Sequence, residues 1–555
     1  MESSLLELKN VIFHPGKLVS QSPRRILPKM HNAPVSPASR PLSTATREWW
    51  AYERPPAFDV VGVTVDVPVR DGITIACELR RPARGGVAVE GTFPAVVVEF
   101  TPYVVLHDFY LGEADFFATR GYTALVPLLR GVGRSGGRWD HGSFRQAGRD
   151  AHDLVEWLAA QPFSDGRIGM LGESFGGQTS YSAAVERPEH LVAIAPMQSP
   201  SSLYHDVVFP GGIKSTERGE IDNWPDVANL TSEGAIDADA EFAANRAHPR
   251  FDAFWRDRSF VDCLDAISIP VLAIGGWNDQ YFRSGTIANI EALPQRTWAI
   301  YGPWAHFFPV ALVDAPALSV NNDERARVLA ETPQLPSGVL LAWFDHWVAG
   351  VPDVPIPPEP TFTSFEGPVG VGAGWRELDG WHRTAPGADL HPVADGSLTV
   401  ASTASDRIVL RQPGTPDRRV DTITFTTAPL AADQVLVGHA SLTFRATLDA
   451  TDAHFYVELI DVDPTGDETL VNDGFLAASH RRSHTDPEPV VVGETDDYRV
   501  AVRAHHYRFR AGSRVRVRMS GGAPTRLDPV PAAVTVAIET GDTAVLRLPG
   551  FSDDL

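Results

Sequence analysis

The sequence is poor in cysteine, with only Cys77 and Cys263 among its 555 residues. Two thiols so far apart cannot form a disulfide framework, and neither lies in the close spacing typical of zinc or redox sites. We therefore expect two free, buried thiols, with a single long-range bridge as the alternative. The same count favours a protein that uses no metal and no cofactor.

Long apolar segments and an excess of basic residues are also missing. No hydrophobic run approaches the roughly 18 residues of a membrane-spanning helix, so we expect no membrane partner. Lys and Arg number 48 against 70 Asp and Glu, which gives a formal net charge of −22. Such a field repels phosphate backbones and disfavours nucleic acid as a partner. No secretory signal is visible at the N-terminus, which favours a cytoplasmic protein.

The chain is too long for a single core, and we expect two or more domains. Residues 1–55 contain a stretch rich in Pro, Ser and Thr, which predicts a flexible N-terminal arm. Strand-like runs alternate with helical patterns over residues 56–200 and again over 266–350. This alternation predicts an α/β core, a parallel sheet with helices on both faces. Oligomeric state stays open, including a homo-oligomer.

Two further regions depart from this alternation. Residues 201–265 are rich in aromatic and acidic residues and are predicted to form a helical cap inserted over the sheet edge. A Pro-rich segment at 351–362 (VPDVPIPPEPTF) is predicted to be a linker. Short alternating strands, such as SLTFRATL and HFYVELIDV, then continue over 363–555 and predict an all-β antiparallel sandwich.

The segment GMLGESFGGQ contains the pattern G-x-S-x-G around Ser174. The pattern is short and frequent, and a turn serine between strand and helix is the alternative interpretation. Here it follows the strand-like RIGML and precedes the helical GGQTSYSAAVERPE, which is the setting that a nucleophile elbow requires. We therefore predict that Ser174 is the nucleophile of a serine hydrolase.

A serine hydroxyl needs a base, and the base needs a carboxylate to orient it. In this architecture the acid and the histidine follow the serine in that order, each just after a strand. Asp279 follows the strand-like IPVLAIGGW, and His306 follows TWAIYGPW. We predict Asp279 as the acid and His306 as the base, although each could have only a structural role. His152 and His190 lie on or after predicted helices and do not meet this requirement.

An acyl-transfer site also needs hydrogen-bond donors for the oxyanion. The backbone amide of Phe175, directly after the serine, is the first candidate. Tyr103 ends an earlier strand in EFTPY, where the second donor of such folds arises, and its hydroxyl could replace an amide. On these grounds alone, an aromatic residue at a loop rim is the stronger interpretation of Tyr103.

The ordered motifs RDGITIACELRRP, EFTPY, RGVGRSGG, GESFGG, GGWNDQYF and GPWAH are together specific. They resemble those of the CocE/NonD-like serine hydrolases, the family of cocaine esterase, α-amino-acid ester hydrolases and X-prolyl dipeptidyl-peptidases. The resemblance covers about residues 58–555. It implies an α/β-hydrolase core, a helical cap and a C-terminal jelly-roll. It also implies a Ser/Asp/His triad at Ser174, Asp279 and His306, with an oxyanion hole formed by Tyr103 and the Phe175 amide.

The resemblance also bears on the substrate. α-Amino-acid ester hydrolases hold the substrate ammonium with acidic residues, two of them just after the triad aspartate. Here Gln280 and Tyr281 follow Asp279, so this clamp is incomplete, with Asp206 as one further carboxylate. The departure favours an ester with a neutral or aromatic acyl group. Candidates for an apolar pocket, each of which could equally serve in packing, are Phe175, Trp277, Tyr281, Trp304 and Phe307.

Two other motifs imitate binding sites. Residues 131–136 fit the dinucleotide pattern G-x-G-x-x-G, but RWDHGSF separates them from the next helix, so we reject a nucleotide site. Residues 461–466 begin like an EF-hand loop. Pro464 interrupts that loop and Asn472 stands where a glutamate is required, so a hairpin turn is favoured.

These observations predict an esterase that works through an acyl-enzyme on a small-molecule ester. An amide hydrolase of the X-prolyl dipeptidyl-peptidase or β-lactam acylase type, using the same three residues, is the first alternative. A binding protein whose β-sandwich recognises a ligand such as carbohydrate is the second. The presence of all three predicted catalytic residues argues against this second alternative.

Overall fold

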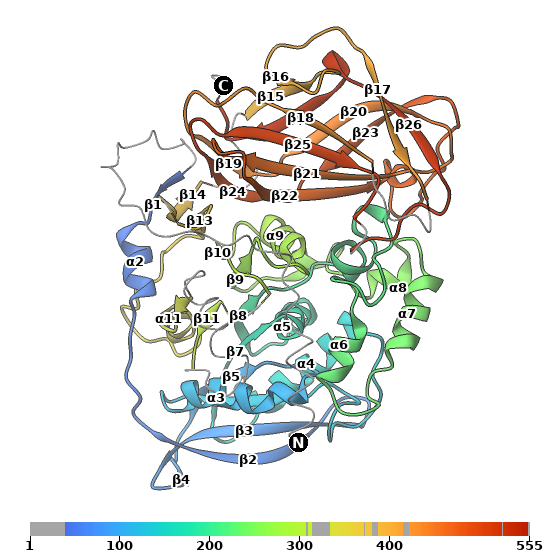
Figure 1. The fold of residues 1–555 in the computed structure, drawn as a ribbon. Helices are drawn as coiled ribbons and strands as arrows, with labels where there is room; N and C mark the ends of the chain where they lie inside the picture. Colours follow the sequence, from blue (N-terminus) through green and yellow to red (C-terminus); the bar gives the residue numbers. More distant parts are fainter. Residues whose placement is uncertain are drawn as a thin grey trace.

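The computed structural model of the chain describes residues 39–306, 309–313, 334–370, 372–379, 387–414, 421–523 and 526–552. An α/β core carries a cap on one side and an all-β domain against its end (Figure 1). Within the described residues, no helix is both long enough and apolar enough to cross a membrane. Cys77 and Cys263 are free thiols, the first buried and the second half-buried.

The core is one twelve-stranded sheet in the order β1-β14-β13-β10-β9-β8-β7-β5-β6-β3-β2, with β4 beside β3. Its parallel part runs from β6 to β13. These strands are buried on both faces, which explains their continuous apolar runs. They are β6 (Thr123–Pro127), β5 (Phe93–Val98), β7 (Ser164–Glu173), β8 (Leu191–Met197), β9 (Val271–Gly276), β10 (Thr297–Gly302) and β13 (Phe362–Glu366).

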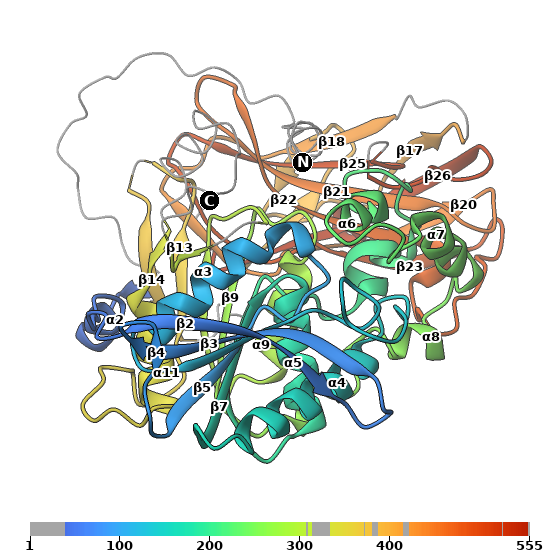
Figure 2. The same ribbon diagram turned by 90° about the horizontal axis from the view of Figure 1, so that it is seen from below.

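Antiparallel strands complete both edges of the sheet. They are β2 (Asp59–Pro68), β3 (Thr74–Arg84) and β4 (Val87–Ala88) at one edge, and β14 (Gly374–Leu378) and β1 (Ser39–Pro41) at the other. The long ribbon of β2 and β3 crosses the core in Figure 2. Helices cover the sheet, and α3 meets α11 where the rings of Phe117 and Phe344 pack edge to face at 5.4 Å. The helices are α2 (Thr44–Trp50), α3 (His107–Ala118), α4 (Phe144–Ala159), α5 (Phe175–Glu186), α9 (Arg283–Ala292) and α11 (Gly338–Trp347).

Two segments join the core sheet although the sequence placed them elsewhere. Part of the expected N-terminal arm forms β1 and α2, because Trp49 is fully buried and its indole N–H donates to the carbonyl of Val339 at 3.0 Å. Strands β13 and β14 lie in the expected sandwich region, but β13 pairs in parallel with β10. Alternation of apolar and polar residues along a strand shows that the strand has two different faces. It does not show which sheet the strand joins. The all-β domain therefore begins at β15 (Gly387–Pro392).

The cap, residues 201–265, lies between β8 and β9 and contains short helices. Its helices α6 to α8 lie beside the core in Figure 1. They are η2 (Tyr204–Val208), η3 (Pro210–Gly212), α6 (Trp224–Asn229), α7 (Ala238–Ala247), α8 (Ala253–Arg256) and η4 (Leu264–Ala266).

The C-terminal domain is the predicted sandwich of antiparallel sheets around its own apolar core. One sheet contains β15, β16 (Leu398–Thr399), β17 (Arg407–Gln412), β20 (Ser441–Leu448), β23 (Thr495–Ala501), β26 (Val534–Glu539) and β27 (Val545–Pro549). The other strands are β18 (Thr422–Thr426), β19 (Gln434–Gly438), β21 (His454–Val462), β22 (Glu468–Ala477), β24 (His505–Phe509) and β25 (Arg514–Ser520). The EF-hand-like segment forms the turn between β21 and β22, as the sequence predicted.

Candidate active site

Ser174 stands at a strained turn between β7 and α5. Its φ of 60° and ψ of −115° lie in a region that costs a non-glycine residue about 1–3 kcal/mol. The Ser174 amide donates to the Met197 carbonyl at 3.0 Å, which fixes the turn against β8. A Cβ atom on Gly172 would lie 2.6 Å from the Gly176 backbone, and one on Gly176 would lie 2.1 Å from Glu99. Backbone contact therefore requires glycine at Gly172, and a side chain at Gly176 would displace the buried Glu99 carboxyl.

The structure brings Ser174, His306 and Asp279 together from three strand ends. Ser174 follows β7, Asp279 follows β9, and His306 follows β10. The His306 Nε2 lies 2.9 Å from the Ser174 Oγ, and its Nδ1 lies 3.0 Å from the Asp279 Oδ2. With a carboxylate at Nδ1, the imidazole proton resides on Nδ1 and leaves Nε2 free to accept the serine proton.

Asp279 is fully buried and held by its own loop. Its Oδ1 accepts hydrogen bonds from the amides of Tyr281 at 2.8 Å and Phe282 at 3.1 Å. Burial lowers the pKa of His306, but the Asp279 carboxylate outweighs this effect, so the net pKa is raised above its ordinary 6.5. The histidine loop is held in turn by Gln198, whose side-chain amide donates to the Ala305 carbonyl at 2.6 Å.

Tyr103 and Phe175 lie on the other side of the serine. Tyr103 forms a side-chain hydrogen bond with Ser174, and burial raises the pKa of Tyr103 so that the phenol keeps its proton. Its ring packs edge to face against Phe175 at 5.7 Å. Phe175 is the first residue of α5, where the backbone N–H has no partner one turn earlier in the helix. Both predicted oxyanion donors therefore lie next to the hydroxyl of Ser174.

Apart from Phe175, which is described above, the predicted pocket residues fall into three groups. Tyr281 is half-buried, and its ring stands edge to face with His306 at 5.0 Å. Trp277 and Trp304 are only 3% and 2% exposed, with Trp277 against His505 at 4.6 Å and Trp304 against Trp375 at 5.6 Å. These two indoles serve in packing, because other rings cover their surfaces. Phe307 lies outside the described residues.

Phe282 was not predicted, although it also contacts the site. Its ring lies 5.2 Å from that of His306, so two aromatic rings flank the imidazole. The signal that could have identified Phe282 is its position three residues after Asp279 and directly after Tyr281. The backbone amides of Tyr281 and Phe282 both donate to the Asp279 carboxylate. Asp206, the further carboxylate considered for an ammonium clamp, instead accepts hydrogen bonds from the amides of Ser201 and Ser202 at 2.8 and 3.0 Å.

Three buried glutamates stand behind the serine turn and were also missed. Glu99, Glu113 and Glu173 are 1%, 2% and 7% exposed. Glu99 Oε1 accepts a hydrogen bond from the Glu173 amide at 2.8 Å, and so holds the backbone directly before Ser174. Burial, reinforced by the charge of Glu113, raises the pKa of Glu99 well above its ordinary value.

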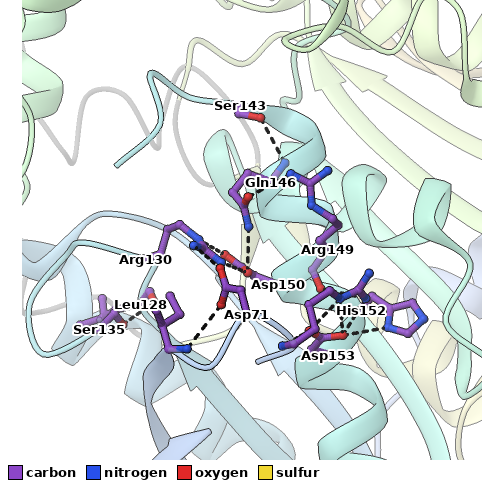
Figure 3. A network of polar contacts seen from close by, with 12 residues as sticks. Asp71, Leu128, Arg130, Ser135, Ser143, Gln146, Arg149, Asp150, His152 and Asp153 are labelled. Carbon is purple, nitrogen blue, oxygen red and sulfur yellow. Dashed lines mark hydrogen bonds and ion pairs between the residues drawn. The ribbon is translucent and has the colours of Figure 1, made fainter. Parts of the chain in front are cut away.

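The glycine-rich segment 131–136 forms a tight turn. Its ends meet where the Gly131 amide donates to the Gly136 carbonyl at 2.9 Å. Arg130 precedes the turn and pairs with Asp150 at 2.6 Å and Asp71 at 2.9 Å (Figure 3). The glycines thus serve the turn, and the helix α4 begins only at Phe144.

A small cavity separates this ion-pair network from the serine turn. Its volume is about 20 Å³, and its lining includes Arg130, Trp139, Asp150 and Phe175. Such a volume holds about one water molecule.

A parallel sheet with a serine at a strained strand–helix turn, and an aspartate and a histidine at later strand ends, defines an α/β-hydrolase. Two parts of the chain match family models of X-Pro dipeptidyl-peptidases. Residues 71–308 match the family model for X-Pro dipeptidyl-peptidase of the S15 family. Residues 354–549 match the model for the X-Pro dipeptidyl-peptidase C-terminal non-catalytic domain. The resemblance seen in the motifs is confirmed.

Individual relatives agree with this assignment. Cocaine esterase from Rhodococcus is 24% identical over 540 residues, covering 83% of this chain and 90% of the relative. The structure of a CocE/NonD family hydrolase from Staphylococcus aureus superposes with a TM-score of 0.71 at 20% identity, covering 89% of this chain and 97% of the other. An α-amino acid ester hydrolase superposes with a TM-score of 0.68 at 18% identity, over 90% and 98% of the two chains. These two structures support the fold alone.

Proposed function

We propose that the protein is a serine carboxylic-ester hydrolase that acts on a small-molecule ester through an acyl-enzyme. The observation that carries the proposal is the hydrogen-bonded series from Asp279 through His306 to Ser174, with Tyr103 bonded to the same hydroxyl. In this proposal Ser174 is the nucleophile, His306 the general base and Asp279 the residue that orients and charges the imidazole.

Acylation begins when the Ser174 Oγ attacks the acyl carbon and its proton passes to the His306 Nε2. The oxyanion then accepts hydrogen bonds from the Tyr103 hydroxyl and the Phe175 amide. Collapse of the tetrahedral intermediate breaks the ester bond, and the leaving alcohol takes the proton from His306. A water molecule, deprotonated by His306, next attacks the acyl-enzyme and releases the acid.

We further propose a neutral or aromatic acyl group. Tyr281 and Phe282 present rings beside His306, where an ammonium clamp would need carboxylates. The carboxylate of Asp206 is already bonded to two backbone amides and is 8% exposed. Burial raises the pKa of Asp206 to about 7, which further weakens it as a partner for a cation.

The test of the proposal is hydrolysis of p-nitrophenyl acetate and p-nitrophenyl benzoate by Ser174→Ala. We expect the activity of this variant to fall to the rate of ester hydrolysis without enzyme. Circular dichroism is expected to show that its fold is intact. Ser182→Ala is the matched control, because Ser182 lies in α5, the helix that follows Ser174, and its buried hydroxyl has no hydrogen-bond partner among the described residues. Full activity in Ser174→Ala would exclude the proposal.

The match to the X-Pro dipeptidyl-peptidase model favours a second candidate, an amide hydrolase with the same three residues. The comparison that separates the two is kcat/KM on an X-Pro-anilide, on a β-lactam and on a simple ester. An esterase cleaves the ester with the highest kcat/KM of the three. If neither class is cleaved and a fluorophosphonate fails to label Ser174, the protein is instead a binding protein.

A further inference from the structure

Three arginines converge on one aspartate where the sandwich meets the core. Arg283 is the first residue of α9 and Asp473 lies in β22, and Figure 1 shows these two elements next to each other. Arg503 and Arg526 lie in loops of the sandwich. Arg283 Nη2 lies 3.4 Å from Asp473 Oδ1, which Arg503 also contacts. Arg526 Nη1 lies 2.6 Å from the Oδ2. The cluster therefore joins α9 to the C-terminal domain.

The charges in this cluster do not balance. The side chain of Asp473 is fully buried, and those of the three arginines are 13–14% exposed. Among the described residues, the ion pairs of these arginines reach one further carboxylate, that of Glu220, 4.0 Å from Arg526. Arginine stays protonated in proteins, so three positive charges share the two carboxylates that lie within 4 Å. Burial of incompletely paired charge is costly.

Each arginine also presents a donor with no acceptor. The Nε of Arg283, the Nε of Arg503 and the Nη2 of Arg526 are buried and lack a hydrogen-bond partner among the described residues. Buried donors of this kind normally have a partner in the protein, a water molecule or an ion. Burial, followed by the charge of Arg526, lowers the pKa of Arg283 to about 9, the direction expected where positive charge is in excess.

The Phe475 ring forms an apolar wall of the cluster. The guanidinium carbons of Arg503 and Arg526 lie 5.1 and 5.2 Å from its centroid. Tyr456 stacks on the same ring at 5.2 Å and bonds Asp473 Oδ2 through its hydroxyl at 3.2 Å. These contacts hold the guanidiniums in place, so the donors are positioned before any ion arrives.

We propose that Arg283, Arg503 and Arg526 form a binding site for one small monovalent anion of the halide class. The arginines outnumber the carboxylates that they contact directly, which favours an anion. Their unpartnered donor atoms are buried, which favours a compact ion over an extended phosphate or a substrate carboxylate. The site is separate from the proposed catalytic residues.

The position of Arg283 gives the ion a structural role. Arg283 Nη1 donates to the Trp277 carbonyl at 3.3 Å and so closes the loop that carries Asp279. The adjacent Phe282 amide bonds the Asp279 carboxylate. A bound anion would therefore stabilise the contact between the sandwich and this loop, and its loss would lower the thermal stability of the protein.

The test measures the melting temperature of the wild-type protein in sodium gluconate, with chloride replacing gluconate at constant ionic strength. We expect the melting temperature to rise with the logarithm of the chloride concentration, by about 2 °C at a hundredfold excess over Kd, because an ion that binds only the folded state stabilises it. Arg526→Gln removes the excess charge and is expected to abolish the rise. The matched control Arg134→Gln removes a surface arginine, 59% exposed, and is expected to keep it.

A second measurement does not depend on how the variant folds. Crystals of the wild-type protein soaked in sodium bromide are expected to show an anomalous peak within hydrogen-bond distance of all three guanidiniums. The absence of this peak, or equal melting temperatures in gluconate and chloride, would overturn the proposal. Neither readout involves ester hydrolysis, so failure of this proposal is distinguishable from failure of the proposed function.

Discussion

Replacing Asp279 by asparagine tests how the imidazole is oriented. The amides of Tyr281 and Phe282 both donate to Oδ1, so the asparagine carbonyl oxygen must take that position. Its NH₂ group then faces His306 Nδ1, where the carboxylate oxygen lies 3.0 Å away in the wild type. An NH₂ group is a donor, so Nδ1 must accept and the imidazole proton moves to Nε2. A protonated Nε2 cannot accept the proton of Ser174.

The expected loss in kcat for Asp279→Asn is about 10⁴-fold, the cost of the wrong tautomer in serine proteases, which corresponds to about 5 kcal/mol. The assay is steady-state hydrolysis of a p-nitrophenyl ester, with circular dichroism to confirm the fold. Asp66→Asn is the control, because Asp66 is 57% exposed and pairs with the surface residue Arg134. Loss of less than tenfold in a folded Asp279→Asn variant would refute the reasoning.

Three further predictions follow from the same region. Tyr103→Phe keeps the ring contact with Phe175 but removes the hydroxyl, and kcat should fall about 10²–10³-fold with little change in KM; unchanged kcat would contradict this role. His306 must be neutral to act as base, and its pKa is raised above 6.5, so kcat/KM should fall on acidification with a midpoint above that value; a midpoint below 6 would be inconsistent with the pairing to Asp279. Burial, followed by the charge of Glu173, raises the pKa of Glu113 from 4.5 to about 8. Between pH 4.5 and about pH 8 only the folded state holds the proton of Glu113. The free energy of unfolding therefore falls by about 1.4 kcal/mol for each unit by which the pH rises. In urea unfolding, the free energy of unfolding of Glu113→Gln should therefore fall by about 4 kcal/mol less than that of the wild type between pH 5 and pH 8. An identical pH dependence in the wild type and the variant would contradict this.

The sequence was informative where local chemistry determines structure. The strained turn at Ser174 requires glycines at defined positions, so the elbow can be read from five residues and the strand before it. Asp279 and His306 could be placed because the carboxyl ends of parallel strands meet at one edge of the sheet. The α/β core and the C-terminal sandwich could be told apart because the hydrophobic periodicity of alternating helices and strands differs from that of strands alone.

Other features depend on contacts between distant segments and could not be predicted. Trp277 and Trp304 follow strands as catalytic residues do, but rings from β14 and β24 cover them. The side chains of β13 alternate like those of a sandwich strand. The strand nevertheless joins the core sheet, where it pairs with β10. The arginine cluster is assembled from segments that are 220 and 23 residues apart in the chain, from Arg283 to Arg503 and on to Arg526.

The most direct test of the account is to trap the acyl-enzyme. The protein is mixed with p-nitrophenyl benzoate, quenched in acid within milliseconds, digested and analysed by mass spectrometry. We predict one benzoyl group on the peptide that carries Ser174, formed with a burst of p-nitrophenol and absent in Ser174→Ala. Hydrolysis without a covalent intermediate, or a benzoyl group on another residue, would contradict the assignment of Ser174 as the nucleophile.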